Sequence, residues 1–293
     1  MKHISLLVVA LLINMPGNGE NFDEIFVDQE WLYSHLEDES LVILHLDKPE
    51  NYIKGHIPGA LFVDNSIYAA VRDGLYFELP EAAEFAEELK KRGVDKTKKV
   101  IISSGWDTFA HAYRFYVTME YFGLADQAKI LDGGIRGWQA EGFTVSTDTV
   151  IPAETRRKPV LKTHPEILVD KDWIKINLSN PEVSIIDARK SDFYTGSEKG
   201  NYKRGGHIMG AKNLTWTTLV DENFTLLEPG RLRDMYTNII DEEEKTLVCY
   251  CHVALRASVL YTVGKALGYD VRLYDGSFNE WDGLDESFPV ENE

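Results

Sequence analysis

The residues with the clearest chemical potential lie near the carboxyl end of the chain, where Cys251 directly follows the apolar run 247–250. This run is typical of a buried strand, and the segment from Ala257 to Leu267 is typical of a helix that ends at Gly268. Cys251 is therefore predicted to lie in the loop between strand and helix. Backbone N–H groups at the start of a helix converge on such a loop and, together with the helix dipole, favour a bound anion.

A cysteine in this position is predicted to be a nucleophile. Nearby positive charge favours the thiolate form, so we expect Cys251 to be partly ionised near neutral pH. Arg256 follows five residues later and could turn its guanidinium towards a bound anion. Cys249, one pleat earlier in the same strand, is expected to be a small buried hydrophobe. Inert packing stays open as the alternative for Cys251.

Length and charge limit the classes of protein to consider. A chain of 293 residues, 44% of them hydrophobic, can bury a sizeable core and is expected to form two domains. The net charge of −17 argues against nucleic acid and anionic membranes as partners. The two cysteines are two residues apart, so no disulfide framework is expected. Cysteines and histidines show no recognised metal-ligand spacing, and no cofactor is predicted.

The first residues resemble a targeting signal. Lys2 and His3 precede the apolar run Ile4 to Ile13, and proline and glycine residues follow up to Gly19. The run is too short to span a bilayer as a stable helix. We expect residues 1–19 to be a signal peptide, which predicts a periplasmic or secreted protein without membrane contact after cleavage. An uncleaved anchor is the alternative, since a clear A-x-A cleavage site is missing.

Helices and short strands alternate from Asn21 onward, and this alternation predicts an α/β fold with a mostly parallel sheet. Predicted strands are 41–46, 100–102, 128–131, 183–186 and 247–250, and predicted helices run from Asp28 to Leu36, Pro80 to Gly93, Phe109 to Phe122 and Asp170 to Leu178.

The pattern occurs twice along the chain. GHIPGA at 55–60 recurs as GHIMGA at 206–211, and DGG at 132–134 recurs as DGS at 275–277. This indicates a tandem duplication. In the alignment of the two copies, Ser104 occupies the position of Cys251. A serine without a nearby base is a poor nucleophile, so the first copy is predicted to be catalytically silent.

Two tandem copies, GHIPGA early in the first, a loop cysteine in the second copy alone and the run DGSFNEW at 275–281 resemble the two-domain rhodaneses. That family comprises thiosulfate and 3-mercaptopyruvate sulfurtransferases, and the resemblance extends from about Phe22 to Phe288. It implies two rhodanese-like α/β domains, each a central mostly parallel sheet flanked by helices, with the active site between them. We expect domain 1 at 22–148, a linker at 149–165 and a catalytic domain 2 at 166–288.

The resemblance implies that Cys251 carries a persulfide during turnover. Cys251 would take sulfur from a small-molecule donor and pass it to a thiol or to cyanide, in a protein expected to be monomeric. Arg189 matches the family arginine that binds the donor's anionic group, and a guanidinium suits a sulfonate or carboxylate. The persulfide would be held by the backbone amides of the loop, which comprises His252, Val253, Ala254, Leu255 and Arg256.

The loop departs from both family patterns. Thiosulfate enzymes usually follow the cysteine with two basic residues and mercaptopyruvate enzymes with Gly-Ser-Gly, so the donor stays open. His252 could add positive charge, depending on pH. Ala254 occupies the usual glycine position, so its backbone must avoid positive φ or accept strain. Val253 replaces the serine of a proposed proton relay, which weakens the case for a matching role of His56. His207 is expected to be structural.

The alternatives to a sulfurtransferase are a phosphatase and a non-catalytic module. Phosphatases of related fold need five residues between cysteine and arginine, whereas four separate Cys251 from Arg256, so no useful phosphatase activity is predicted. A non-catalytic module that binds sulfur or anions for docking is the second alternative. An activated thiolate would react with iodoacetamide well below pH 8, whereas an inert buried thiol would not.

Overall fold

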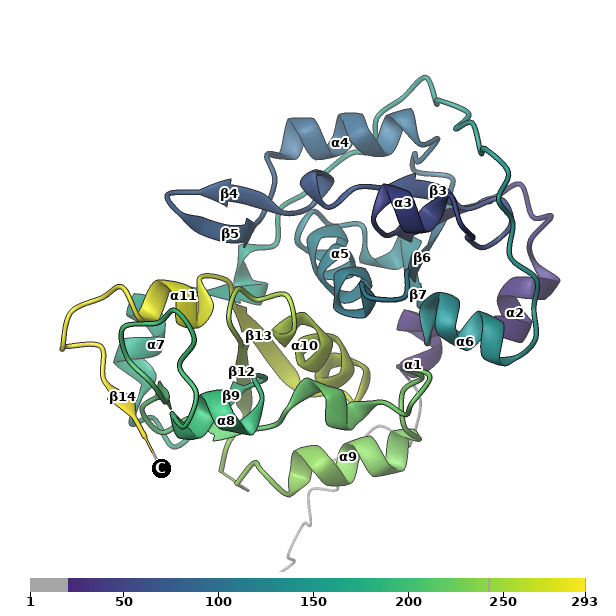
Figure 1. Ribbon diagram of the computed structural model, residues 1–293. Coiled ribbons are helices and arrows are strands. Elements are labelled where there is room, and N and C mark those ends of the chain that lie inside the picture. Colours follow the sequence, from purple (N-terminus) through teal and green to yellow (C-terminus); the bar gives the residue numbers. More distant parts are fainter. Residues whose placement is uncertain (1–20, 242, 293) are drawn as a thin grey trace, which may run out of the picture.

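The computed structural model describes residues 21–241 and 243–292, so the predicted signal peptide lies outside the described residues. Two similar α/β domains follow one another along the chain, the first purple to teal and the second green to yellow (Figure 1). Each contains a parallel five-stranded sheet, as the sequence predicts. Within the described ranges, none of the helices has the length and apolar character needed to cross a membrane.

The two sheets have the same strand order. In the first domain β1 (Phe26–Val27), β7 (Ala128–Leu131), β6 (Lys99–Ser104), β2 (Leu41–Leu46) and β3 (Leu61–Val63) follow one another across the sheet. In the second domain the corresponding strands are β8 (Leu168–Val169), β13 (Asp270–Tyr274), β12 (Thr246–Tyr250), β9 (Val183–Asp187) and β11 (Lys212–Asn213). Strands β6 and β12 hold the same central position, so Ser104 and Cys251 lie at equivalent ends of equivalent strands.

Helices flank both sheets. Those of the first domain are α1 (Phe22–Ile25), α2 (Gln29–Ser34), α3 (Pro49–Tyr52), α4 (Ala82–Lys91), α5 (Phe109–Tyr121) and α6 (Gly134–Ala140). Those of the second are α7 (Lys171–Asn177), α8 (Ser191–Thr195), α9 (Pro229–Thr237), α10 (Ala257–Ala266) and α11 (Ser277–Trp281). The structure also contains two small antiparallel pairs, β4 (Ala70–Arg72) with β5 (Leu75–Glu78) and β10 (His207–Ile208) with β14 (Val290–Glu291).

Local sequence signals account for several helix boundaries. The Asp28 side chain accepts a hydrogen bond from the Trp31 amide at 2.7 Å, and Asp170 caps α7 in the same way. The helix predicted to begin at Pro80 begins instead at Ala82, because Glu81 has an extended backbone and is its N-cap. Gly268 adopts a φ of +88° directly after the last turn of α10.

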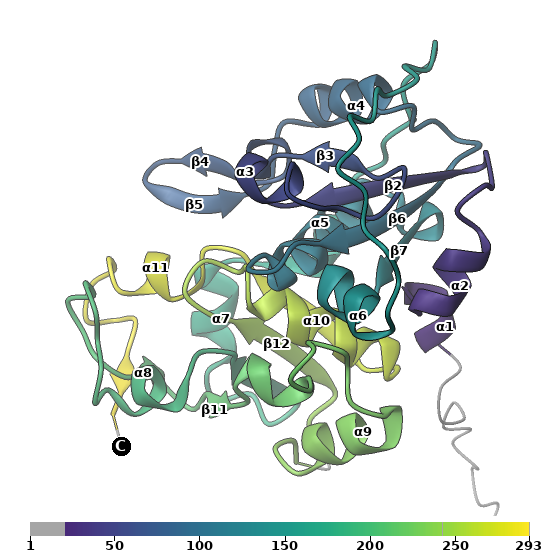
Figure 2. The same ribbon diagram turned by 45° about the vertical axis from the view of Figure 1, so that its right-hand side comes forward.

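The domains meet along α5 and α10, the equivalent helices of the two copies, which lie side by side in the centre of the molecule (Figures 1 and 2). Buried apolar residues of both domains belong to one continuous core there. Phe109 of α5 stacks on Trp216 of the second domain, with ring centroids 5.9 Å apart. This shared core holds the two domains together.

Candidate functional site

The site lies at the carboxyl edge of the second sheet, where three adjacent parallel strands end. Strands β9, β12 and β13 pair in register, and Arg189, Cys251 and Ser277 follow them. The carboxyl ends of parallel strands are where α/β sheets bind ligands. Three segments far apart in sequence are therefore brought to one place.

Cys251 is 1% exposed, and its loop is fastened by Ser277. The Ser277 hydroxyl accepts hydrogen bonds from the amides of Cys251, at 3.3 Å, and Ala254, at 2.9 Å. The same hydroxyl donates to the carbonyl of Tyr274 at 2.9 Å. One buried side chain thus ties the Cys251 loop to the turn after β13.

The first turn of α11 fastens the loop from the other direction. The amides of Phe278 and Asn279 donate to the carbonyls of Cys251 and His252, each at 3.0 Å. Helix N-termini leave N–H groups without intrahelical acceptors, and here the loop supplies those acceptors. The backbone of Cys251 is consequently held on both its N–H and C=O sides.

Comparison of the two repeats shows why Ser277 is specific to the second. Its counterpart Gly134 lies so close to Ser104 that an added Cβ would be 2.2 Å from the Ser104 hydroxyl oxygen. The first copy therefore combines a serine on the loop with a glycine on the turn, and the second combines a cysteine with a serine. Both turns have a positive φ at this position, +53° at Gly134 and +51° at Ser277.

Of the loop N–H groups that are predicted to bind an anion, two already donate hydrogen bonds within the described residues and three do not. The Ala254 amide is bonded to Ser277, and the Leu255 amide donates to the Val253 carbonyl at 2.8 Å. Within the described part of the chain, the amides of His252, Val253 and Arg256 have no hydrogen-bond acceptor. Those three N–H groups are the ones that can turn to a bound anion. The Arg256 side chain is exposed, and the side chains of Val253 and Leu255 are half-buried.

The backbone of Ala254 adopts a strained conformation with positive φ, which is one of the two possibilities that follow from an alanine at the usual glycine position. Its φ is +58°, in the left-handed region where a Cβ is unfavourable, and the residue is fully buried. The loop thus keeps the conformation of a glycine-containing turn without a glycine.

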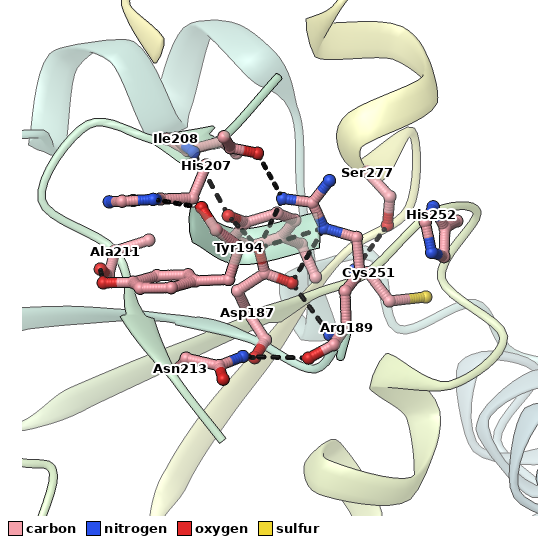
Figure 3. A network of polar contacts seen from close by, with 12 residues as sticks. Asp187, Arg189, Tyr194, His207, Ile208, Ala211, Asn213, Cys251, His252 and Ser277 are labelled. Carbon is pink, nitrogen blue, oxygen red and sulfur yellow. Dashed lines mark hydrogen bonds and ion pairs between the residues drawn. The ribbon is translucent and has the colours of Figure 1, made fainter. Parts of the chain in front are cut away.

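Arg189 is buried behind the loop and bound to the protein itself. Its Nε and Nη2 donate to the Asp187 carboxylate, Nη2 at 2.6 Å, and Nη2 also donates to the Gly206 carbonyl at 2.7 Å. Its guanidinium lies 4.0 Å from the centroid of the Phe278 ring. Burial opposes the charge, yet Asp187 raises the pKa of Arg189 above its ordinary value, so the side chain stays cationic. Figure 3 places Cys251, His252 and Ser277 beside this network.

This arrangement narrows what Arg189 can do. The sequence predicts that the guanidinium of Arg189 binds the anionic group of a donor, whereas in the structure its Nε and Nη2 groups donate to Asp187. Only Nη1 has no hydrogen-bond acceptor within the described ranges. Asp187 also accepts a hydrogen bond from the Tyr250 hydroxyl at 2.7 Å, which makes it the centre of a buried network.

His252 is uncharged at neutral pH. Burial, followed by the charges of Arg189 and Arg256, lowers the pKa of His252 to about 4. Its Nδ1 lies 2.9 Å from the Tyr202 hydroxyl, and the two rings are parallel with centroids 5.6 Å apart. Burial raises the pKa of Tyr202 well above its usual range, so the hydroxyl keeps its proton. A hydroxyl that donates to Nδ1 leaves the ring proton on Nε2.

His56 and His207 make the same contacts in their respective domains. His207 Nδ1 lies 2.8 Å from the Tyr194 carbonyl oxygen, and His56 Nδ1 lies 2.9 Å from the Tyr52 carbonyl oxygen. Each imidazole stacks on the ring of that tyrosine, with centroids 3.8 Å and 3.9 Å apart. Both histidines are buried and support the loop that follows the first long strand of each domain.

Sequence reasoning missed two residues of the site, Ser277 and Tyr202. Ser277 stands in a quoted motif, and its exchange with Gly134 between the repeats was the available signal. Tyr202 lies in a glycine-rich loop where nothing in the sequence connects it with His252. In the part of the chain that the structure describes, no group of three or more His, Cys, Asp or Glu side chains could hold a metal ion.

Comparison with protein families gives two matches to the model described as the Rhodanese-like domain, at residues 28–141 and 170–284. Similar curated proteins include a sulfur carrier protein of Thermus thermophilus, 29% identical over 91% of this chain and 96% of the relative. A 3-mercaptopyruvate sulfurtransferase of Escherichia coli is 28% identical over 91% of this chain and 97% of the relative.

Among solved structures, an anaerobic ergothioneine biosynthesis enzyme of Chlorobium limicola, bound to its substrate trimethyl histidine, superimposes with a TM-score of 0.81. The match covers 94% of this chain and 71% of that one, at 21% sequence identity. At this identity the likeness is one of fold alone.

Proposed function

Because the chain belongs to the rhodanese-like family, we propose that it transfers a sulfane sulfur from a small-molecule donor to a thiophilic acceptor through a persulfide on Cys251. Relatives that match most of the chain are named sulfurtransferases, which supports sulfur transfer in general. One observation carries the assignment to Cys251. The cysteine lies at the carboxyl edge of the sheet, in a loop whose backbone is fixed while three amides remain available.

In the first half-reaction the Cys251 thiolate attacks the outer sulfur of the donor. With thiosulfate, a new S–S bond forms to Cys251 while the donor's S–S bond breaks, and sulfite leaves with the electron pair. With 3-mercaptopyruvate, the carbon–sulfur bond breaks and the carbon takes up the electron pair and a proton to give pyruvate. The free amides of His252, Val253 and Arg256 can stabilise the negative charge on the outer persulfide sulfur.

In the second half-reaction a thiolate or cyanide attacks that outer sulfur. The bond between the two sulfur atoms of the persulfide breaks, and its electron pair returns to Cys251 as the thiolate. A covalent intermediate between two half-reactions predicts ping-pong kinetics. Cys249 has no part in this scheme, because it is fully buried and burial raises the pKa of its thiol far above the ordinary value.

Few positive charges in the site are free to bind a donor anion, so the site favours a donor that does not depend on several ion pairs. His252 is neutral at pH 7, and most of the Arg189 fork is bound to Asp187. The remaining attractions are the Nη1 group of Arg189, the exposed guanidinium of Arg256 and the loop amides. We therefore propose that a donor binds mainly through backbone N–H groups, and we leave open whether it is thiosulfate or 3-mercaptopyruvate.

The test is the intact mass of the reduced protein after exposure to each donor. We expect a gain of one sulfur atom in the wild type and in Cys249→Ser, and none in Cys251→Ser. Cys249→Ser is the matched control, since it removes the other thiol of the chain. A folded wild-type protein that gains no sulfur from either donor would refute the proposal.

The alternative is a non-catalytic module that binds sulfur species or anions, and the burial of Cys251 and the internal pairing of Arg189 favour it. Iodoacetamide discriminates between the two. Modification of Cys251 well below pH 8 would support the enzyme, and resistance to modification would support the module. Export from the cytoplasm stays a proposal from the sequence, since residues 1–20 lie outside the described ranges.

A further inference from the structure

A buried ion pair crosses the domain interface next to the catalytic loop. Arg114, on α5 of the silent first domain, is 0% exposed, and its Nη1 lies 2.6 Å from the Asp275 carboxylate of the second domain. Arg114 also donates to the Phe77 carbonyl at the end of the β4–β5 hairpin. One side chain thus connects a helix and a hairpin of the first domain with the turn after β13 of the second.

Asp275 is two residues before Ser277 in that turn. Ser277 holds the Cys251 and Ala254 amides, and Phe278, the next residue, donates its amide to the Cys251 carbonyl. The position of the turn therefore sets the position of the nucleophile's backbone. A displacement of Asp275 therefore reaches Cys251 through a short connection that ends in the buried side chain of Ser277.

Stability alone gives little reason for this pair. Burying two charges costs desolvation energy, and replacing such a pair with apolar residues is often neutral or stabilising. The groups that face the pair add to the cost, because the Glu78 carboxylate is close enough to Asp275 for repulsion. Burial and Asp275 together raise the pKa of Glu78 to about 7. The Arg114–Asp275 pair is energetically unfavourable to bury, and it lies at the turn that holds the Cys251 loop. This combination indicates that the pair positions the loop.

We propose that Arg114 is a positioning residue for sulfur transfer, through which the silent domain holds the turn 275–277 and, through Ser277, the loop of Cys251 in their reactive geometry. This inference rests on the proposed function of Cys251. It gives the first repeat a role that needs no nucleophile of its own.

The repeat structure supplies a matched control. Asp132 is the counterpart of Asp275, and its carboxylate also crosses the interface, accepting a hydrogen bond from the Leu226 amide at 3.0 Å. Its turn faces Ser104 instead of a nucleophile. Asp132→Ala thus removes an equivalent interdomain contact without touching the loop of Cys251.

The experiment measures two rates in the full-length protein. The first is persulfide formation from thiosulfate or 3-mercaptopyruvate, whichever loads the wild type, and the second is alkylation of Cys251 by iodoacetamide across pH 6 to 9. The variants are Arg114→Met, Asp275→Asn, their combination and Asp132→Ala, and urea unfolding gives the stability of each. We expect both rates to fall about tenfold in the two single variants, because a small displacement of a reacting group is enough for such a loss.

The combined variant separates positioning from stability. Removing both charges relieves the unpaired buried group, so stability is expected to recover relative to the single variants. Both rates are expected to stay as low as in the single variants, because the connection is still broken. Arg114→Lys, which retains the charge, is expected to lie between Arg114→Met and the wild type.

Three results would overturn the proposal: wild-type rates in folded Asp275→Asn, rates in the combined variant that recover with stability, or an equal loss of both rates in Asp132→Ala. If Arg114→Met does not fold, Asp275→Asn and Arg114→Lys carry the same comparison. Alkylation needs no sulfur donor, so it tests Arg114 even if neither donor loads Cys251. Failure of the proposed function and failure of this inference are therefore distinguishable.

Discussion

Replacing Ser277 with alanine tests whether the catalytic loop depends on the hydroxyl that fastens it. The change removes two accepted hydrogen bonds, from the amides of Cys251 and Ala254, and one donated to Tyr274. A typical intramolecular hydrogen bond contributes about 1 kcal/mol net, so the free energy of unfolding should fall by roughly 3 kcal/mol. If half of that loss also applies to the transition state, persulfide formation slows about tenfold.

Ser277→Gly separates the loss of the hydrogen bonds from the effect of the backbone conformation on the free energy of unfolding. It removes the same hydrogen bonds but also removes the Cβ from a residue whose φ is +51°. A left-handed residue with a Cβ costs about 1–2 kcal/mol, so the glycine variant should be more stable than the alanine variant by about 1 kcal/mol. Both variants should show the same slow persulfide formation, since both lack the hydroxyl.

The assay combines urea unfolding with single-turnover mass measurement of the persulfide. Ser104→Ala, in the silent copy, is the matched control and should keep the wild-type rate. Persulfide formation at the wild-type rate in Ser277→Ala would refute the reasoning, because it would mean that the loop keeps its geometry without Ser277.

Three further predictions follow from the same contacts. Ala254→Gly should raise the free energy of unfolding by about 1 kcal/mol by relieving a φ of +58°, and a lower urea midpoint would contradict this. Burial raises the pKa of Asp132 to about 7 in the folded protein. Its contribution to stability should therefore fall as pH rises from about 4 to about 7, and Asp132→Asn should lose this decline in a pH series of unfolding measurements. Because His252 has a pKa of about 4, its charge does not change near pH 6.5. Measured as a function of pH, the rate of persulfide formation should therefore have no step there, and the wild type and His252→Asn should give curves of the same shape between pH 6 and 7.

The sequence was sufficient for the elements that depend on local pattern. The β7 strand at 128–131 matches its prediction, and α10 differs from its prediction by one residue. Apolar periodicity and capping residues act within a few positions, so the chain itself carries that information. The duplication in the sequence is enough to align Ser104 with Cys251, and their strands hold equivalent positions in the two sheets.

The contacts within the site could not be predicted in the same way. Asp187 and Arg189 are two residues apart, but nothing local indicates that the carboxylate turns back to occupy the guanidinium. The Tyr202 hydroxyl contacts His252, which is 50 residues away in the sequence, and Arg114 of the first domain pairs with Asp275 of the second. Such pairings depend on which side chains the completed fold brings together. Each changes the expected chemistry, since Arg189 offers a donor fewer free N–H groups than its residue type suggests.

The exchange between the repeats, together with the contact across the domain interface, suggests how the two copies would cooperate in one site. In the first copy Gly134 lies against Ser104, and there a serine hydroxyl on the turn would collide with the loop. In the second copy the turn carries Ser277, which accepts hydrogen bonds from the loop amides, and Asp275 beside it is held by Arg114 from the first copy. On the proposed function, the second copy supplies the nucleophile Cys251 and the side chain of Ser277 that fixes its loop, while the first copy supplies the charge of Arg114 that holds Asp275 in place. In the full chain, where the shared core stays intact, Arg114→Met leaves Asp275 without its cation, and we expect Cys251 to be alkylated more slowly for that reason.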